Sequence, residues 1–324
     1  MPRPVEKLRF LVTGGYGFIG SNVVIELLQR GHRVVVIDDL STGFEQNLSS
    51  VANHPLLTTV IASVNDYARV AECVNGVDVV VHAAVRNIML STREPHLDLQ
   101  TNIAGTLNVL SVARERGAKV IYLSSSSIYG EPAFVPTNED VPPDLRLPYC
   151  VSKYAGEMYC RLYHRMYGLP VVILRLTNTY GRNQRPVNGY YCGVIGRFLF
   201  SVLKGNPVRI HGTGEQTRDF IHVSDVVSAI LLAAECEEMN GEVYNVGTGI
   251  EISLHDLALM CLSFGSFVKG KLDYIAERDY IDVISRRCLD IRKIRQFGWE
   301  PGFSLLAGLR NTFEWLKREY SDDK

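Results

Sequence analysis

Short apolar runs alternate with longer amphipathic stretches through the first half of the chain. The apolar runs predict β-strands at Leu8–Thr13, Arg33–Ile37, Leu57–Ala62, Val77–Val81 and Lys119–Leu123. The amphipathic stretches predict helices that end near Arg30, cover about Asp98 to Arg116, and cover Val151 to Tyr167. Apolar strands that alternate with helices are typical of βαβ units. The pattern therefore predicts the α/β class, with a doubly wound parallel sheet whose ligand crevice lies at the carboxyl ends of the strands.

The turn between the first strand and the first helix is rich in glycine, and reads Gly14-Gly15-Tyr16-Gly17-Phe18-Ile19-Gly20. Gly14 permits the tight bend, Gly17 lets the backbone approach a pyrophosphate, and Gly20 lets helix and strand pack closely. The second strand closes on Asp38-Asp39, about 20 residues beyond the loop, where an acid can accept hydrogen bonds from a ribose diol. This order of strand, glycine turn, helix, strand and acid predicts a dinucleotide-binding site. Two adjacent acids would repel a 2′-phosphate, so NAD is favoured over NADP.

Two later strand ends carry small and polar residues. The fourth apolar run ends at His82-Ala83-Ala84, and the fifth continues into Ser124-Ser125-Ser126-Ser127. Small residues such as Ala83 and Ala84 suit the close passage of a cofactor. We interpret His82 as a packed or capping histidine rather than a catalytic one.

The regular alternation breaks after about residue 180. A polar loop follows at Gly181–Tyr191, and then helices are expected at Val194–Lys204, Val223–Cys236, from Ser253 to about Phe264, and at Leu305–Tyr320. Short strands are expected at Val208–Ile210 and Glu242–Val246. We expect residues 1–178 to form an NAD-binding Rossmann domain, which the elements near 206–246 rejoin, and residues 179–324 to form mainly a smaller substrate-binding α/β cap.

Composition narrows the class of protein. The chain has 324 residues, 46% of them hydrophobic, and a net charge of -1 with scattered Lys and Arg. This argues against partners such as nucleic acid or an anionic membrane. The seven Cys have no metal-binding spacing, so no metal site is expected, and they indicate reduced thiols in a cytoplasmic protein. The start of the chain lacks an apolar signal region, and no run approaches the roughly 18 apolar residues of a membrane span.

Tyr149 and Lys153 stand four residues apart at the start of a predicted helix. At that spacing two side chains lie on one helix face. A phenol alone is a poor acid or base near neutral pH, and a neighbouring ammonium favours its phenolate. The pair therefore predicts a catalytic acid/base. The alternative is a surface Tyr and Lys that share a helix by chance.

Together with later segments, these motifs resemble those of the extended short-chain dehydrogenase/reductases, in the nucleotide-sugar epimerase/dehydratase branch that includes UDP-glucose 4-epimerase. The resemblance rests on the glycine turn, His82-Ala83-Ala84, the serine segment through Gly130, the Tyr149/Lys153 pair, Arg175–Gly181 and Gly214–Phe220. It implies a general acid/base role for Tyr149, and for Lys153 a contact with the nicotinamide ribose and a lowered tyrosine pKa. Ser125 would bond the same sugar hydroxyl as Tyr149.

The resemblance also extends the cofactor site, to Phe18, Ile19, Ala83, Ala84 and Asn102. The third strand ends in Ala62-Ser63 where the family has Gly-Asp, so the adenine contact falls to Ser63 and Val64 or lies elsewhere. Cys150 occupies a place that is usually Gly or Ala. It is either a packed small residue or a residue of the nicotinamide pocket.

The implied reaction is the oxidation of C4 of a nucleotide sugar by bound NAD, followed in an epimerase by reduction of the keto sugar from its other face. Dehydratases and decarboxylases of the branch carry an acid in the serine segment, where this chain has Ser126 and Ser127. Glu131 comes after that segment. Serine is a poor base for removing a C–H proton. A UDP-hexose 4-epimerase is therefore favoured over a 4,6-dehydratase or another keto-sugar-forming enzyme, and a non-catalytic NAD sensor is the alternative of a different class.

The resemblance assigns Asn178 and Ser126 to the substrate. Arg218 would pair with the substrate diphosphate, unless it is salt-bridged to Asp219 or Asp225. Arg278 is a second phosphate candidate. Arg287 is either a contact for an acidic sugar or a solvated arginine. The helices near 98–116 and 151–167 would pair across a two-fold axis, so a homodimer is expected.

Overall fold

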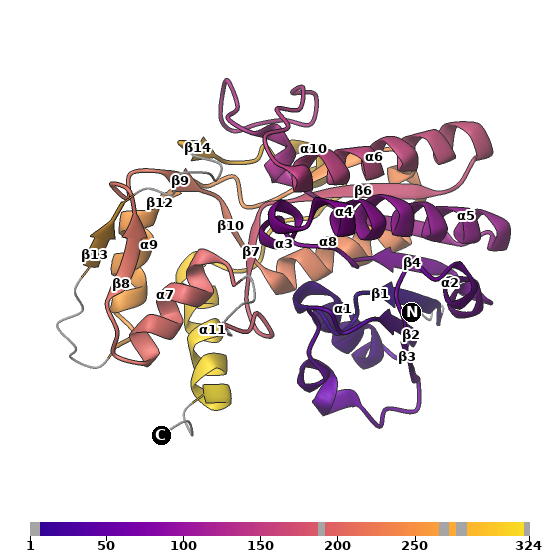
Figure 1. Cartoon of the computed structure of the whole chain (residues 1–324), viewed down its shortest axis with the longest axis horizontal. Coiled ribbons are helices and arrows are strands. Elements are labelled where there is room, and N and C mark those ends of the chain that lie inside the picture. Colours follow the sequence, from indigo (N-terminus) through magenta and orange to yellow (C-terminus); the bar gives the residue numbers. More distant parts are fainter. Residues whose placement is uncertain (1–6, 187–191, 266–271, 277–283, 321–324) are drawn as a thin grey trace. The chain divides into compact units, whose positions relative to one another are not determined.

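The computed structural model describes residues 7–186, 192–265, 272–276 and 284–320 (Figure 1). The chain forms two compact units. The first comprises Met1–Ser124, Leu147–Leu174 and Ala229–Val243, and the second comprises Ser125–Arg146, Arg175–Ser228 and Tyr244–Lys324. The chain passes between the units several times, so neither is one continuous stretch.

A seven-stranded sheet has the strand order β11-β6-β5-β4-β1-β2-β3. Its strands are β1 (Arg9–Thr13), β2 (Arg33–Asp38), β3 (Leu57–Ile61), β4 (Val79–His82), β5 (Lys119–Ser125), β6 (Val171–Leu176) and β11 (Val243–Val246). The pairs β1/β2, β2/β3, β1/β4 and β4/β5 are parallel. The strand order reverses between β1 and β4, which is where dinucleotides bind in such sheets. The predicted doubly wound parallel sheet is confirmed.

Helices cover this sheet. They are α1 (Phe18–Gln29), η1 (Glu45–Val51), α2 (Tyr67–Val74), α3 (Ile88–Arg93), α4 (Pro95–Asp98), the π-helix η2 (Leu99–Gly105), α5 (Thr106–Arg116), α6 (Pro148–Tyr167) and α8 (Val223–Glu235), with the short turn η4 (Glu237–Met239). One core layer joins side chains of α2, α5 and α6 to Leu11, Ile37, Val80 and Val120 of the strands. Figure 1 shows α5 and α6 side by side.

Two helices differ from their predicted bounds. The stretch from Asp98 to Arg116 is not one α-helix, because Leu99–Gly105 is π-helical. This wider turn carries Asn102, whose side chain bonds the backbone of Arg86. Helix α6 begins at Pro148 rather than Val151, since proline is tolerated at the first helical position, where no intrahelical N–H bond is needed.

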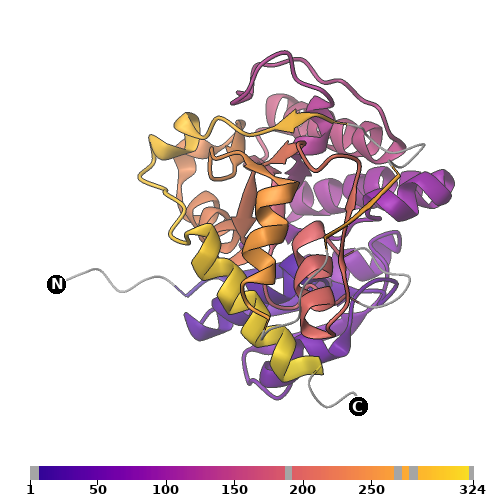
Figure 2. The ribbon, with the colours of Figure 1, turned by 90° about the vertical axis from the view of Figure 1, so that its left-hand side faces the viewer.

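The second unit has its own core. Its helices are η3 (Ser126–Tyr129), α7 (Val194–Leu203), α9 (Leu254–Leu262), α10 (Arg292–Arg295) and α11 (Leu305–Tyr320). Its strands are β7 (Asn178–Tyr180), β8 (Val208–His211), β9 (Thr217–Arg218), β10 (Phe220–His222), β12 (Ile252–Ser253), β13 (Leu272–Ile275) and β14 (Arg286–Arg287). Helices α7, α9 and α11 lie together (Figure 2). Their shared core includes Phe198, Leu257 and Phe313. Helix α9 follows Ser253, as expected, and the Ser253 hydroxyl caps it by accepting the Asp256 N–H.

Within the described part of the chain, no helix has the length and apolar character needed to cross a membrane.

Candidate active site

The glycine turn joins β1 to α1 in the first unit. Gly14 has a φ of 67°, a left-handed conformation that favours glycine, and its N–H donates to the Ile37 carbonyl at 2.8 Å. A Cβ on Gly20 would collide with the carbonyl oxygen of Gly14. Among the described residues, no side chain caps α1 at Gly17. The N–H groups of the first helical turn therefore suit a phosphate, and the turn fits the pyrophosphate of NAD.

Asp38 and Asp39 have different environments at the end of β2. Asp38 is buried, and its carboxylate accepts the N–H groups of Tyr16 at 2.9 Å and Leu40 at 2.8 Å. Burial raises the pKa of the Asp38 carboxyl, and these hydrogen bonds oppose the shift. Asp39 is exposed and accepts the Ser41 N–H. Asp38 is therefore the acid fixed against the glycine turn.

His82 is packed, as predicted. Its ring nitrogens lie 2.8 Å from Thr13 Oγ1 and 2.9 Å from Thr106 Oγ1. Burial, with the nearby charge of Lys153, lowers the pKa of His82 to about 3, so the ring is neutral at physiological pH. Thr13 Oγ1 also accepts the Ala84 N–H at 3.1 Å, which places Ala83 and Ala84 beside Gly14.

The remaining cofactor candidates lie on the loop after β3 and on the π-helix. Ser63 is half-buried and its hydroxyl accepts the Asn65 N–H, while Val64 is buried against Gly105. Asn102 is buried. Its amide oxygen accepts the Arg86 N–H at 2.8 Å, and its amide nitrogen donates to the Arg86 carbonyl at 3.1 Å. Asn102 thus holds the chain that follows β4.

Tyr149 and Lys153 lie in the first turns of α6. Tyr149 is half-buried, whereas Lys153 is 3% exposed, with its Nζ 4.1 Å from the centre of the Tyr122 ring. Burial lowers the pKa of Lys153 to about 8, and the nearby charges of Glu157 and Asp98 oppose this shift. Cys150 is buried, which agrees with the packed alternative. The geometry provides a phenol and a readily titrated ammonium on one helix face.

The serine segment belongs to the second unit from Ser125 onward. Ser125 ends β5, and its hydroxyl accepts the Ser127 N–H at 3.1 Å, while Ser126 is buried. Tyr129 anchors the end of this turn. Its hydroxyl accepts a bond from Arg175 Nη1 and donates to Asn245 Oδ1, both at 2.8 Å. The turn that carries Ser125 and Ser126 is therefore held by a buried polar network.

The structure brings Arg218 and Arg287 together, because β9 and β14 pair in parallel with these two residues in register. Arg287 is 6% exposed, so the interpretation as a solvated arginine is wrong. The carboxylates proposed as alternative partners of Arg218 accept backbone N–H groups elsewhere, Asp219 from Thr248 and Asp225 from Gly302. Arg278 lies outside the described residues.

Asp219 connects the segments that carry the substrate candidates. Its carbonyl oxygen accepts the side chain of Asn178 at 3.0 Å, and its N–H donates to the Arg287 carbonyl at 2.9 Å. Neither this role nor the buried acids Asp98 and Glu157 were predicted from the sequence. Glu157 follows Lys153 by one helical turn, and that spacing was the one available signal.

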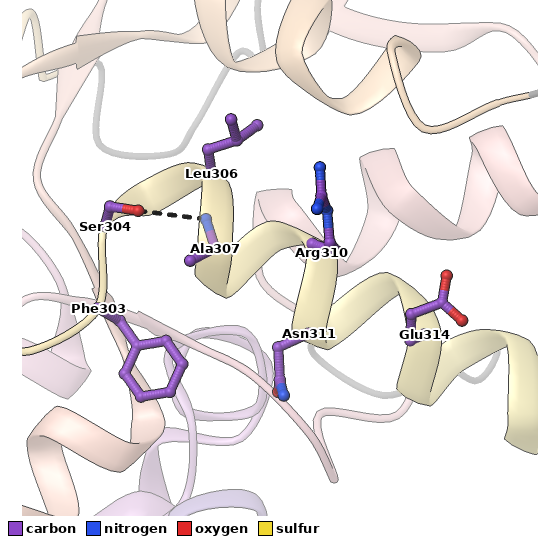
Figure 3. A pocket seen from close by; sticks show the side chains of 7 residues that line it. All are labelled: Phe303, Ser304, Leu306, Ala307, Arg310, Asn311 and Glu314. Carbon is purple, nitrogen blue, oxygen red and sulfur yellow. Dashed lines mark hydrogen bonds between the residues drawn. The ribbon is translucent and has the colours of Figure 1, made fainter.

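A hollow in the second unit lies over α11 (Figure 3). Its lining comprises Phe303, Ser304, Leu306, Ala307, Arg310, Asn311 and Glu314. None of the predicted site residues is among them.

Comparisons with known proteins agree with this arrangement. The model of the NAD dependent epimerase/dehydratase family matches residues 10–247. The UDP-glucose 4-epimerase of Mycolicibacterium smegmatis is 34% identical over 323 residues, covering 96% of this chain and 99% of that protein. A UDP-N-acetyl-alpha-D-glucosaminuronate decarboxylase of Bacillus cytotoxicus is also 34% identical, over 332 residues that cover 98% of this chain and 100% of that protein. The crystal structure of UDP-glucose 4-epimerase from Thermotoga maritima, with UDP-glucose, has a TM-score of 0.90 at 35% identity, and covers 96% of this chain and 99% of that chain.

The chain therefore belongs to the NAD-dependent epimerase/dehydratase family, and the predicted family and cofactor, NAD, are confirmed. The family is enzymatic. Its members in these comparisons are named for epimerisation and decarboxylation at equal identity. The family alone therefore leaves the type of reaction open.

Proposed function

We propose that the protein is a nucleotide-sugar 4-epimerase of the UDP-hexose type, working through a transient 4-keto sugar. The observation that carries the proposal is the serine turn. Ser126 and Ser127 occupy the turn, and the nearest following acid, Glu131, has its carboxylate bonded to the Ser285 N–H at 2.8 Å. A hydroxyl can bind a sugar oxygen but is a poor base for the C–H proton that dehydration requires.

The members of the proposed catalytic set have different tasks. Tyr149 takes the proton of the sugar C4 hydroxyl and returns it after the sugar has turned. Lys153 stabilises the phenolate by its charge and holds the nicotinamide ribose. Ser125 donates a hydrogen bond to the same sugar oxygen. NAD, when bound, supplies the reversible oxidation at C4.

The paired arginines provide the proposed anchor for the nucleotide. Arg218 and Arg287 are in register on β9 and β14, and guanidinium groups suit phosphate oxygens. Tight binding of the remote diphosphate, with Asn178 and Ser126 closer to the sugar, lets the sugar itself be held loosely enough to turn. The buried Arg287 also suits the carboxylate of an acidic sugar.

The test is to incubate the purified protein with a panel of neutral, N-acetylated and uronic-acid sugar nucleotides, with chromatography and mass spectrometry as readout. We expect a new peak of unchanged mass, because epimerisation moves no atoms out of the molecule. A product lighter by water or by carbon dioxide would instead identify a dehydratase or a decarboxylase, and no conversion would favour the NAD sensor. Arg287→Ala should weaken any preference for the uronic-acid substrate, and an unchanged preference would remove that role.

We also propose a homodimer built on α6. Val151, Met158 and Met166 are 49%, 37% and 58% exposed. With the half-buried Ala155 and Leu162 between them, they form one stripe along the helix, at the spacing of a single helix face. Exposed apolar stripes of this kind mark protein interfaces. Light scattering at micromolar concentration should give twice the mass of the chain, and Met158→Glu should give the monomer mass. A wild-type monomer would contradict the proposal.

A further inference from the structure

A carboxyl group lies fully buried one helical turn beyond Lys153. Glu157 is 0% exposed, and its Oε1 accepts a hydrogen bond from Ser124 Oγ at 2.5 Å. Ser124 lies near the end of β5, so this bond joins α6 to the sheet within the first unit. A buried carboxylate is costly unless donors or a cation compensate its charge. The buried charge of Glu157 therefore calls for a neighbouring group that compensates it.

The cation that fits is Lys153. Residues four apart on a helix share one face, and Lys153 is itself almost fully buried. Its ammonium faces the Tyr122 ring, and the Tyr122 hydroxyl donates to the Lys153 carbonyl at 3.2 Å. Burial depresses the pKa of Lys153, while the charges of Glu157 and Asp98 act to keep its proton. The carboxylate and the ammonium thus reduce each other's cost of burial.

The other buried acid, Asp98, is compensated differently. Its Oδ1 accepts hydrogen bonds from Ser91, Asn102 and Ser152. Among the described residues, the other titratable groups that interact with the pair include Cys160 on α6, Tyr122 on β5 and His82 on β4, and Tyr149 lies one turn before Lys153 on α6. Burial raises the pKa of Tyr122 and Cys160 and lowers that of His82, so all three are neutral near pH 7. Of the two buried acids whose charges act on Lys153, Glu157 therefore has the larger effect.

We propose that Glu157 is a positioning residue for the acid/base pair, and that its negative charge sets the pH at which Tyr149 and Lys153 release their proton. This inference rests on the proposed function, in which that pair performs the chemistry. Glu157 itself touches neither sugar nor cofactor in this scheme. It acts through Lys153, and through Lys153 on Tyr149.

The experiment compares Glu157→Gln, which removes the charge and keeps the shape, with Glu157→Asp, which keeps the charge. The phenolate of Tyr149 is followed by ultraviolet absorbance against pH in the NAD-loaded protein, as the difference from the same protein carrying Tyr149→Phe. Loss of a neighbouring anion favours loss of a proton. Glu157→Gln should therefore lower the pH of phenolate formation by about one unit, and Glu157→Asp should leave it in place.

A Gln variant that titrates with the wild type overturns the inference and makes Glu157 a structural link to Ser124. The titration of Tyr149 needs no turnover. If no sugar nucleotide in the panel is converted, the proposed function is contradicted, but the titration result remains valid. If Glu157→Gln does not fold, the double variant Lys153→Met/Glu157→Gln tests whether the Glu157 carboxylate compensates the Lys153 ammonium. Removing both charges should restore folding if the carboxylate serves the ammonium, and a double variant that also fails to fold overturns the inference.

Discussion

Replacing Tyr149 by Phe should abolish turnover of the sugar nucleotide while NAD stays bound. The substitution keeps the ring on α6 and removes the hydroxyl that exchanges a proton with the sugar. A positioned general acid/base contributes roughly 10²–10⁴-fold to rate, so kcat should fall by at least the lower part of that range. The glycine turn and Asp38 do not depend on the phenol, so NAD content should be unchanged. Steady-state kinetics and the nicotinamide released on denaturation measure the two quantities.

Tyr167→Phe is the matched control, since it removes one hydroxyl from the same helix. Tyr167 is 48% exposed, and its ring contacts Tyr163 and Arg114. Its turnover should equal that of the wild type. Substantial turnover in Tyr149→Phe would show that another group moves the proton. Loss of NAD from Tyr149→Phe would show instead that the phenol is a binding group for the cofactor.

The parts of this fold that could be predicted are those with local signals. The strands β1, β2, β4 and β5 are apolar on both faces, and their burial is continuous along the strand. The glycine turn and the Tyr149/Lys153 pair are each fixed by spacing within a few residues. Local periodicity and local spacing are visible in one sequence because the interacting positions are close along the chain.

The parts that could not be predicted depend on contacts between distant segments. Arg218 and Arg287 are register partners, yet they are far apart in the chain, and nothing near Arg287 marks it as buried. The π-helical turn was equally hidden, because the Asn102 side chain bonds the backbone of Arg86, which lies outside the helix, as well as Asp98 one turn before it. Such placements follow from tertiary packing, which overrides local propensity.

Substitution of Asp219 is the second change for which we expect a large effect, in this case on stability. Its side chain is 0% exposed, and its carboxylate accepts the N–H groups of Thr248 at 2.9 Å, Gly249 at 3.2 Å and Leu289 at 3.4 Å. Burial raises the pKa of this carboxyl, and the hydrogen bonds from Thr248 and Gly249 act against that shift. A Cβ on Gly247 would collide with the carboxylate, so the turn fits tightly around it. Asp219→Asn turns one acceptor into a donor amid buried N–H groups.

We expect Asp219→Asn to lower the melting temperature by roughly 5–10 °C, since each buried donor left unpaired costs about 1–3 kcal/mol. Asp273→Asn is the control. It breaks an exposed ion pair with Arg209 at 3.3 Å, which contributes at most about 1 kcal/mol. Calorimetry measures both variants.

Asp219→Asn should also affect binding of the sugar nucleotide without affecting binding of NAD. The segments that Asp219 joins carry the proposed substrate residues Asn178 and Arg287, whereas the proposed pyrophosphate turn lies in the first unit. Loosening that junction should raise KM for the sugar nucleotide and leave NAD content unchanged. If the variant melts with the wild type, the carboxylate bonds contribute little. If it melts early but KM is unchanged, Asp219 supports the second unit without placing the substrate residues, and the assignment of Asn178 and Arg287 to the substrate loses its structural basis.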